Sequence, residues 1–238
     1  AQELAARAFN SRYTFFSTNG TSTSNKVLIQ TLLKPGDAIL LDRNCHKSVH
    51  YGVVISGAEP IYLMPSVNKQ YGIFGPIPKK QIIEAMDEAL EKGRKLKAII
   101  LTNCTYDGLI YDIADIVNEA HKRNVKVIVD EAWFGYANFH REFFPSAMAA
   151  GADYSTQSTH KTMSAFSQAS MIHVNDPDFE QFQDFFMENC LPGCSHKADG
   201  DGRLFAFAAC AGIGRIAEKV GKFAGKIQGA GVSRFNQR

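Results

Sequence analysis

Lys126-Val-Ile-Val-Asp-Glu131 is a short apolar run that ends in two acidic residues. A continuous apolar run of this length is typical of a strand buried on both faces of a sheet. Lys97-Ala-Ile-Ile-Leu101 has the same character and is followed by the polar residues Thr102 and Asn103. The two runs therefore predict parallel strands whose carboxyl ends carry polar side chains.

Strand-like and helix-like segments alternate outward from these two runs. Apolar runs predict further strands at 38–41, 60–64 and 170–174, and helical periodicity with start and stop signals predicts helices at 21–33, 46–56, 79–92 and 112–123. This alternation predicts an α/β protein, a three-layer α/β/α sandwich around a mostly parallel sheet. In such sheets ligands bind outside the carboxyl ends of the strands.

The composition excludes several classes of protein. The chain has 238 residues, of which 45% are hydrophobic, and a net charge of +2, which suits a soluble domain with a buried core. The small net charge and the scattered Lys and Arg argue against nucleic-acid binding. No apolar run reaches the ~20 residues of a membrane helix, and Ala1-Gln-Glu-Leu4 lacks the layout of a signal peptide. We therefore expect no membrane contact and a cytoplasmic location.

The five cysteines do not predict a metal site or a disulfide framework. Cys190 and Cys194 form one close pair without a second, whereas a zinc site needs further Cys or His ligands. Reduced thiols are the simpler interpretation.

Asn19-Gly-Thr-Ser-Thr-Ser-Asn25 is a hydroxyl-rich turn at a predicted helix start. Free backbone N–H groups, the positive helix end and the hydroxyls of Thr21 and Ser22 favour a phosphate group. An ordinary N-cap uses the same residue types, and this segment alone favours that interpretation. The turn matches neither a P-loop nor the GxGxxG pattern.

Asp130 follows the strand directly, so its carboxylate should lie at the ligand edge of the sheet. A strand-end Asp is usually a turn former or a helix cap. The same carboxylate can keep a pyridine nitrogen protonated, which would make pyridoxal phosphate (PLP) an electron sink. Trp133, the only tryptophan, either lines that site or packs in the core.

Lys161 ends the sequence Ser158-Thr-His-Lys161, which follows Tyr154–Gln157, a short polar run. Burial and neighbouring cations lower the pKa of a lysine, and the free amine can then form a Schiff base. On this tetrapeptide alone, a surface lysine is the better interpretation. His46 could stack on an aromatic cofactor, although a lone histidine is more often a hydrogen-bonded structural residue.

Several motifs resemble the bacterial ornithine/lysine/arginine decarboxylases in the same order. These motifs are Phe16–Lys26, Asp42–Ser48, Thr102–Gly108, Asp130–Trp133, Gln157–Lys161 and Phe166–Val174, and the resemblance covers roughly residues 9 to 189. It implies PLP as the cofactor, on the aspartate aminotransferase fold.

The resemblance also implies a role for each candidate residue. Lys161 would hold the cofactor covalently, and His160 beside it would assist proton transfer. Asp130 would pair with the ring nitrogen, and His46 would stack on the ring. The phosphate would lie on Gly20, Thr21, Ser22 and Ser158, and the residues against the cofactor would be Ala132 and Trp133.

The activity implied by the resemblance is decarboxylation of arginine, lysine or ornithine to the amine of polyamine metabolism and CO2, by a homodimer. Another PLP lyase or an aminotransferase of the same fold is the first alternative. The second is a non-catalytic, truncated fragment.

Residues 1–189 are expected to form the PLP-binding large domain, and residues 190–238 an atypical tail. The tail contains 9 of the 19 glycines and does not match the family pattern after Asn189. We expect it to be disordered, or to be the product of a frameshift.

Overall fold

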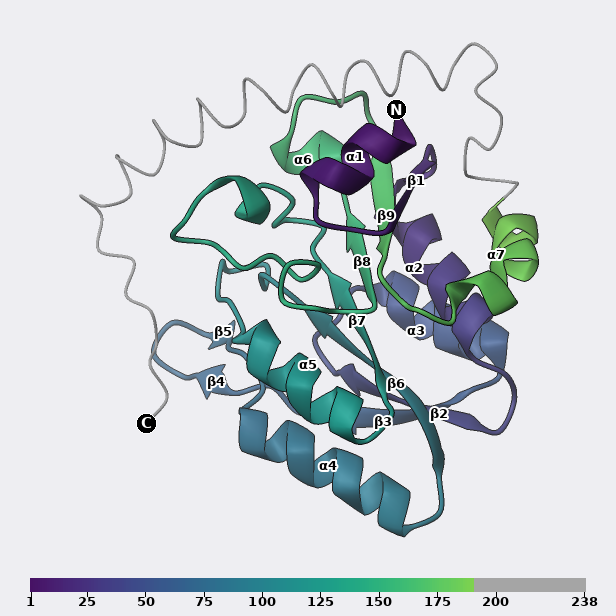
Figure 1. Ribbon diagram of the computed structural model, residues 1–238. Coiled ribbons are helices and arrows are strands. Elements are labelled where there is room, and N and C mark those ends of the chain that lie inside the picture. The colour runs from purple at the N-terminus through teal and green to yellow at the C-terminus, as the bar shows by residue number, and fades with distance from the viewer. Residues whose placement is uncertain (191–238) are drawn as a thin grey trace.

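The computed structural model describes residues 1–190, and a seven-stranded sheet runs through this part of the chain (Figure 1). Its strands are β1 (Tyr13–Ser17), β2 (Asp37–Asp42), β3 (Glu59–Leu63), β6 (Lys95–Thr102), β7 (Lys126–Asp130), β8 (Tyr154–Gln157) and β9 (Ser170–Val174). The strands β4 (Val67–Asn68) and β5 (Ile73–Phe74) form a separate hairpin. The helices are α1 (Gln2–Ala8), α2 (Gly20–Leu32), α3 (Lys47–Ser56), α4 (Lys79–Glu91), α5 (Ile113–Lys122), α6 (Thr159–Thr162) and α7 (Gln183–Cys190), with 3-10 turns at Ala137–Phe139 and Phe179–Gln181.

The strand order is β1-β9-β8-β7-β6-β2-β3. The strands β3, β2, β6, β7 and β8 are mutually parallel, whereas β9 runs antiparallel to both of its neighbours. The prediction of a mostly parallel sheet is therefore confirmed. Because the carboxyl ends of the parallel strands meet at one edge, the polar residues that follow them are brought together there.

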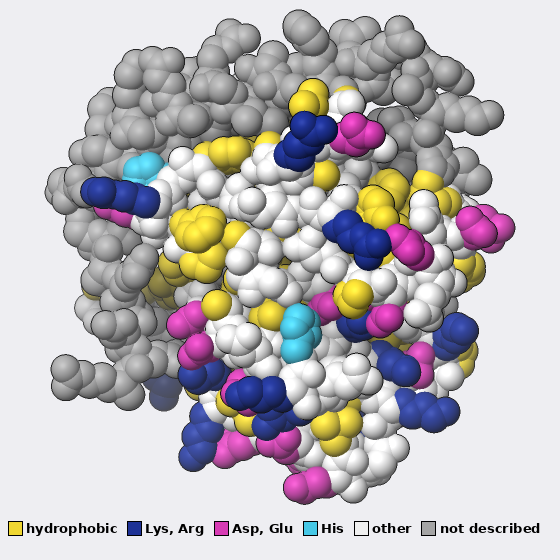
Figure 2. Space-filling model, viewed as in Figure 1, with side chains coloured by type: hydrophobic (Ala, Val, Ile, Leu, Met, Phe, Trp, Pro, Cys, Tyr) yellow, Lys and Arg dark blue, Asp and Glu magenta, His cyan; other side chains and the backbone are white. Residues whose placement is uncertain are grey.

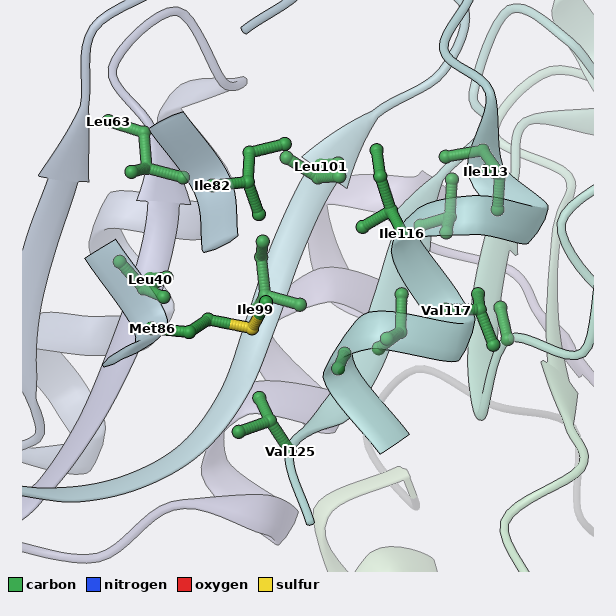
Figure 3. Packing of buried hydrophobic residues seen from close by; sticks show 14 of the residues in the cluster. Leu40, Leu63, Ile82, Met86, Ile99, Leu101, Ile113, Ile116, Val117 and Val125 are labelled. Atoms are coloured by element: carbon green, nitrogen blue, oxygen red, sulfur yellow. The ribbon is translucent and has the colours of Figure 1, made fainter. Parts of the chain in front are cut away.

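One face of the sheet packs against α4 and α5. Alternate strand side chains point to opposite faces, and Ile99 and Leu101 of β6 belong to the cluster on this side. Figure 3 shows Ile82 and Met86 of α4 directed toward Leu40 of β2 and these two β6 residues.

The opposite face packs against α2, α3 and α7. Ala98 and Ile100 of β6 alternate with the residues above and join Leu28 of α2, Val49 of α3 and Phe186 of α7 in a second cluster. A sheet with a helical layer on each face is the three-layer α/β/α architecture that the alternating pattern predicts (Figure 1).

The predicted elements differ from those observed by one or two residues at their ends, but β8 was read as a polar run and not as a strand. The strand was therefore not predicted, and in the structure it pairs with β7 and every one of its residues is buried. Its polar side chains have partners: the hydroxyls of Tyr154, Ser155 and Thr156 donate to Asp176, Glu131 and Asn25 at 2.6, 2.9 and 2.7 Å. A polar strand is stable in the interior when its polar atoms form hydrogen bonds.

The expected tail lies outside the described residues, apart from Cys190 at the end of α7. Within residues 1–190 no helix has both the length and the apolar character needed to span a bilayer. On the face shown in Figure 2, Lys and Arg side chains are interspersed with Asp and Glu. Several of these charges form ion pairs, including Lys79 with Asp115 and Arg123 with Asp87.

Candidate functional site

Polar side chains meet at the carboxyl ends of the three central strands β6, β7 and β8. Thr102 ends β6 and lies opposite Asp130 at the end of β7, which in turn lies opposite Thr156 of β8. The loop after β8 leads directly through Ser158 into the short helix α6, which carries His160 and Lys161.

The Asp130 carboxylate is buried and held on both oxygens. Its Oδ1 accepts a hydrogen bond from the backbone N–H of Ala132 at 3.0 Å, and its Oδ2 accepts one from Asn25 Nδ2 at 2.9 Å. Burial raises the pKa of Asp130, and the hydrogen bonds from Asn25 and Ala132 act in the opposite direction. The hydroxyl oxygen of Thr102 is buried without a hydrogen-bond partner in the described part of the chain.

The side chain of Lys161 extends over the face of Trp133. Its Nζ lies 4.6 Å from the centre of the indole ring, a cation–π contact. Lys161 is exposed by accessible surface, yet partial desolvation lowers its pKa, and the nearby negative charge of Asp130 partly offsets this effect. Trp133 is 40% exposed and meets Tyr106 edge to face, so the indole is not a core residue.

His46 caps the N-terminus of α3. Its Nδ1 accepts the backbone N–H of Ser48 at 3.2 Å and lies 2.8 Å from the Ser48 hydroxyl. Burial lowers the pKa of His46, Asp130 raises it, and Lys161 and Lys47 lower it. The structure thus brings His46, Asp130 and Lys161 within electrostatic reach of one another.

His160 is turned toward the following loop. Its Nδ1 lies 2.8 Å from the carbonyl oxygen of Ala169, and a carbonyl only accepts, so Nδ1 carries the proton. The lone pair of the neutral ring is therefore on Nε2.

The first turn of α2 lies against the loop after β8. Gly20 begins the helix with a φ of 72°, in the left-handed region, and its N–H donates to the carbonyl of Gln168. Thr21 is buried and its hydroxyl lies 2.6 Å from that of Ser158. Ser22 is exposed at the same turn, and the hydroxyl oxygen of Thr159 is buried without a partner in the described region.

Sequence reasoning missed Asn25 and Ser48 as members of this site. Asn25 is fully buried and bonds to Asp130, Ser48 and Thr156 at once. Its position four residues after Thr21 was an available signal, because residues at i and i+4 share a helix face. For Ser48, the only available signal was its position two residues after His46.

A second buried carboxyl group, Glu131, lies beside the site. Its Oε1 accepts the backbone N–H of Ala147, and its Oε2 accepts Ser155 Oγ and Gln157 Nε2, all at 2.8–2.9 Å. Burial raises its pKa from 4.5 to about 7. Gln157 continues the network to His173, whose pKa burial lowers to about 3.

Glu131→Gln is expected to change the pH dependence of folding. Because the folded pKa is above the unfolded one, the stability from protonated Glu131 is complete below pH 4.5 and is lost as the pH rises through about 7. The loss amounts to roughly 3 kcal/mol, and glutamine, which has no charge, removes it. In chemical unfolding from pH 4 to 9, this variant should therefore gain roughly 3 kcal/mol of stability relative to the unsubstituted chain as the pH rises through about 7.

Glu84→Gln on the exposed side of α4 is the matched control for Glu131→Gln and should keep the profile of the unsubstituted chain. Parallel profiles for Glu131→Gln and the unsubstituted chain would contradict the assignment of the pH dependence to this group.

Solved structures with this architecture define the class of the fold. The lysine decarboxylase LdcF of Francisella novicida superposes with a TM-score of 0.71 and 34% identity, over 91% of this chain and 30% of that one. A structure described as serine palmitoyltransferase from Sphingomonas wittichii superposes with a TM-score of 0.68 at 18% identity, over 91% and 50% of the two chains. The fold is that of the large domain of PLP-dependent decarboxylases and transferases.

The family follows from the sequence comparison. The family model described as Orn/Lys/Arg decarboxylase, major domain, matches residues 1–192. The chain therefore belongs to the Orn/Lys/Arg decarboxylase family.

Individual relatives agree with the family. The lysine decarboxylase LdcA of Pseudomonas aeruginosa is 43% identical over 209 residues, and the biodegradative arginine decarboxylase of Escherichia coli is 34% identical over 208. Each match covers 79% of this chain but only 27% of the relative, so the chain spans about a quarter of their length.

Proposed function

We propose that this chain is the PLP-binding major domain of a decarboxylase that converts a basic amino acid to its amine and CO2. One observation carries the proposal: the buried carboxylate of Asp130 ends the central strand β7, and the amine of Lys161 lies within its electrostatic reach over Trp133. The family membership supplies the reaction and the class of substrate.

The residues present fit PLP. The buried hydroxyl oxygens of Thr102 and Thr159 have no partner among the described residues, so the site has hydrogen-bonding capacity that the chain itself does not use. The first turn of α2 and the hydroxyls of Thr21, Ser22 and Ser158 form an anion-binding end, beginning at Gly20.

Each site residue then has a chemical task. Lys161 would hold the cofactor through its amine, which its lowered pKa makes easier to deprotonate. Asp130 would pair with the protonated ring nitrogen, and His46 would lie on the ring face. Ala132 and Trp133 would lie against the cofactor, and the Nε2 lone pair of His160 would accept or return a proton at the substrate end. When bound, PLP supplies an electron sink for the electrons left by the departing carboxylate.

The wider setting is part of the same proposal. The named relatives act on lysine or arginine, so the substrate is proposed to be lysine, arginine or ornithine, and the product an amine of polyamine metabolism. We propose a cytoplasmic homodimer in which residues 1–189 form the cofactor-binding domain. Two-fold dimers are the commonest assembly of soluble proteins.

The test is to incubate the 238-residue chain with PLP and each of the three amino acids. Release of labelled CO2 together with the matching amine supports the proposal. Transfer of the amino group to a keto acid without CO2 release would identify an aminotransferase instead. A stable PLP absorbance with neither product would show that this chain is a cofactor-binding fragment only.

A further inference from the structure

We propose that Asn25 is a positioning residue that holds Asp130 and His46 as one hydrogen-bonded unit. The inference rests on the proposed function, in which these two side chains contact the nitrogen and the face of the same ring. Asn25 itself does not need to touch the cofactor.

The amide of Asn25 is oriented by its three partners. Its Nδ2 donates to Asp130 Oδ2 at 2.9 Å and to Ser48 Oγ at 3.1 Å, and its Oδ1 accepts the Thr156 hydroxyl at 2.7 Å. When Asp130 is ionised, a flipped amide would place Oδ1 against a carboxylate that only accepts hydrogen bonds. Both donors and the acceptor of this fully buried side chain are therefore used in one orientation.

Ser48 extends the unit to His46. The Ser48 backbone N–H donates to His46 Nδ1, so this nitrogen is an acceptor, and the Ser48 hydroxyl at 2.8 Å can donate to it as well. That hydroxyl in turn accepts from Asn25. A directed chain thus runs from Asn25 through Ser48 to His46, and it leaves the proton of the neutral imidazole on Nε2.

The unit joins four elements of the fold. Asn25 lies on α2, Ser48 on α3, Asp130 on β7 and Thr156 on β8. Rotation of the carboxylate and of the imidazole would each break a hydrogen bond to a buried partner, which is costly in the interior. One amide therefore fixes two side chains that the sequence separates by 84 positions, His46 and Asp130.

The first experiment measures unfolding of the full chain without PLP from pH 4, close to the ordinary pKa of an aspartate, to pH 9. Removing the Asn25 hydrogen bond in Asn25→Ala raises the pKa of Asp130 further, so the folded state loses more stability than that of the unsubstituted chain as the pH rises and Asp130 ionises. We expect the unfolding equilibrium constant of Asn25→Ala, relative to the unsubstituted chain, to be about 10-fold larger at the alkaline end than at the acidic end.

The other groups that act on Asp130 are common to both chains. They are His46 and Lys161, and Asp130 in turn acts on Glu131 and Cys45. Their titration is present with and without Asn25, so the comparison isolates the amide.

Ser24→Ala is the matched control. Ser24 is the preceding residue of α2, is fully buried, and bonds through its hydroxyl to Ser170 at 2.7 Å and not to the unit. Its loss should destabilise the chain equally at all pH values, as a purely structural defect does. A pH-independent deficit in Asn25→Ala would overturn the proposal.

The second experiment measures PLP affinity by equilibrium titration of absorbance. Asn25→Ala should weaken binding about 10- to 100-fold, because one hydrogen bond to a charged group is lost. The same substitution should have little further effect in an Asp130→Asn background, because the group on which it acts is gone. Full additivity of the two substitutions would refute the inference.

The two experiments separate this inference from the proposed function. If the chain binds no PLP but Asn25→Ala shows the pH-dependent loss of stability, the inference about Asn25 stands and the proposed function fails. If the chain binds PLP and Asn25→Ala is unchanged in both measurements, the proposed function stands and the inference about Asn25 fails.

Discussion

Lys161→Ala is expected to abolish the attachment of PLP that survives borohydride reduction. Lys161 is the lysine whose amine lies over Trp133 near the buried Asp130, and burial lowers its pKa. An amine with a lowered pKa loses its proton more readily, and only the unprotonated amine attacks an aldehyde. Peptide mapping of the reduced, unsubstituted chain should place the label on Lys161 alone.

Lys47→Ala is the control for this prediction. Lys47 is exposed beside His46 on α3, close to the site but without the contact to Trp133. This variant should keep the full label. Label spread over Lys47 and Lys26, with Lys161 unmodified, would remove the basis of the proposed function.

Asp130→Asn is expected to weaken PLP binding by about 10²- to 10³-fold, because it leaves the charged ring nitrogen without its buried partner. Without PLP the same variant should unfold within about 1 kcal/mol of the unsubstituted chain near pH 8. The variant loses one hydrogen bond from Asn25 or Ala132. It also loses a carboxylate whose pKa burial raises, and with it the cost of burying a charge. The lost hydrogen bond and the removed charge have opposite effects on the free energy of unfolding.

Asp42→Asn is the matched control for Asp130→Asn. Asp42 also ends a parallel strand, is 2% exposed, and has a pKa that burial raises, but its carboxylate contacts Asn44 and Tyr111. Its replacement should leave PLP affinity unchanged. An equal loss of PLP affinity in the two variants would show that strand-end carboxylates act through the stability of the fold in general and not through contact with the cofactor.

The parallel strands β2, β3, β6 and β7 and the helices beside them could be predicted from the sequence because their signals are local. Ile99, Val127 and their neighbours form apolar runs, and the helix at 79–92 shows a 3.6-residue period, so each element could be recognised from a few adjacent residues. The polar residues at the ends of β6 and β7 are next to these apolar runs in the sequence, so they could also be assigned to the ligand edge.

The strand β8 could not be found in this way. Tyr154–Gln157 has the composition of a solvated loop, and it is buried only because Glu131, Asn25 and Asp176 accept its hydroxyl protons. Those acceptors are 22 to 131 positions away in the sequence. Local propensity does not report such partners, and tertiary hydrogen bonding decided the element.

The sequence by itself determined the fold class, the position of Asp130 at a strand end and the place of Lys161 after Ser158. Only the tertiary structure decided which of these polar residues share one hydrogen-bonded unit. Asn25 reads as the last residue of a hydroxyl-rich turn, yet in the fold it bonds to Asp130 and Ser48 across 105 and 23 positions. The physical reason is that a buried amide takes its function from the partners that complete its hydrogen bonds, and those partners are set by the packing of helices on the sheet.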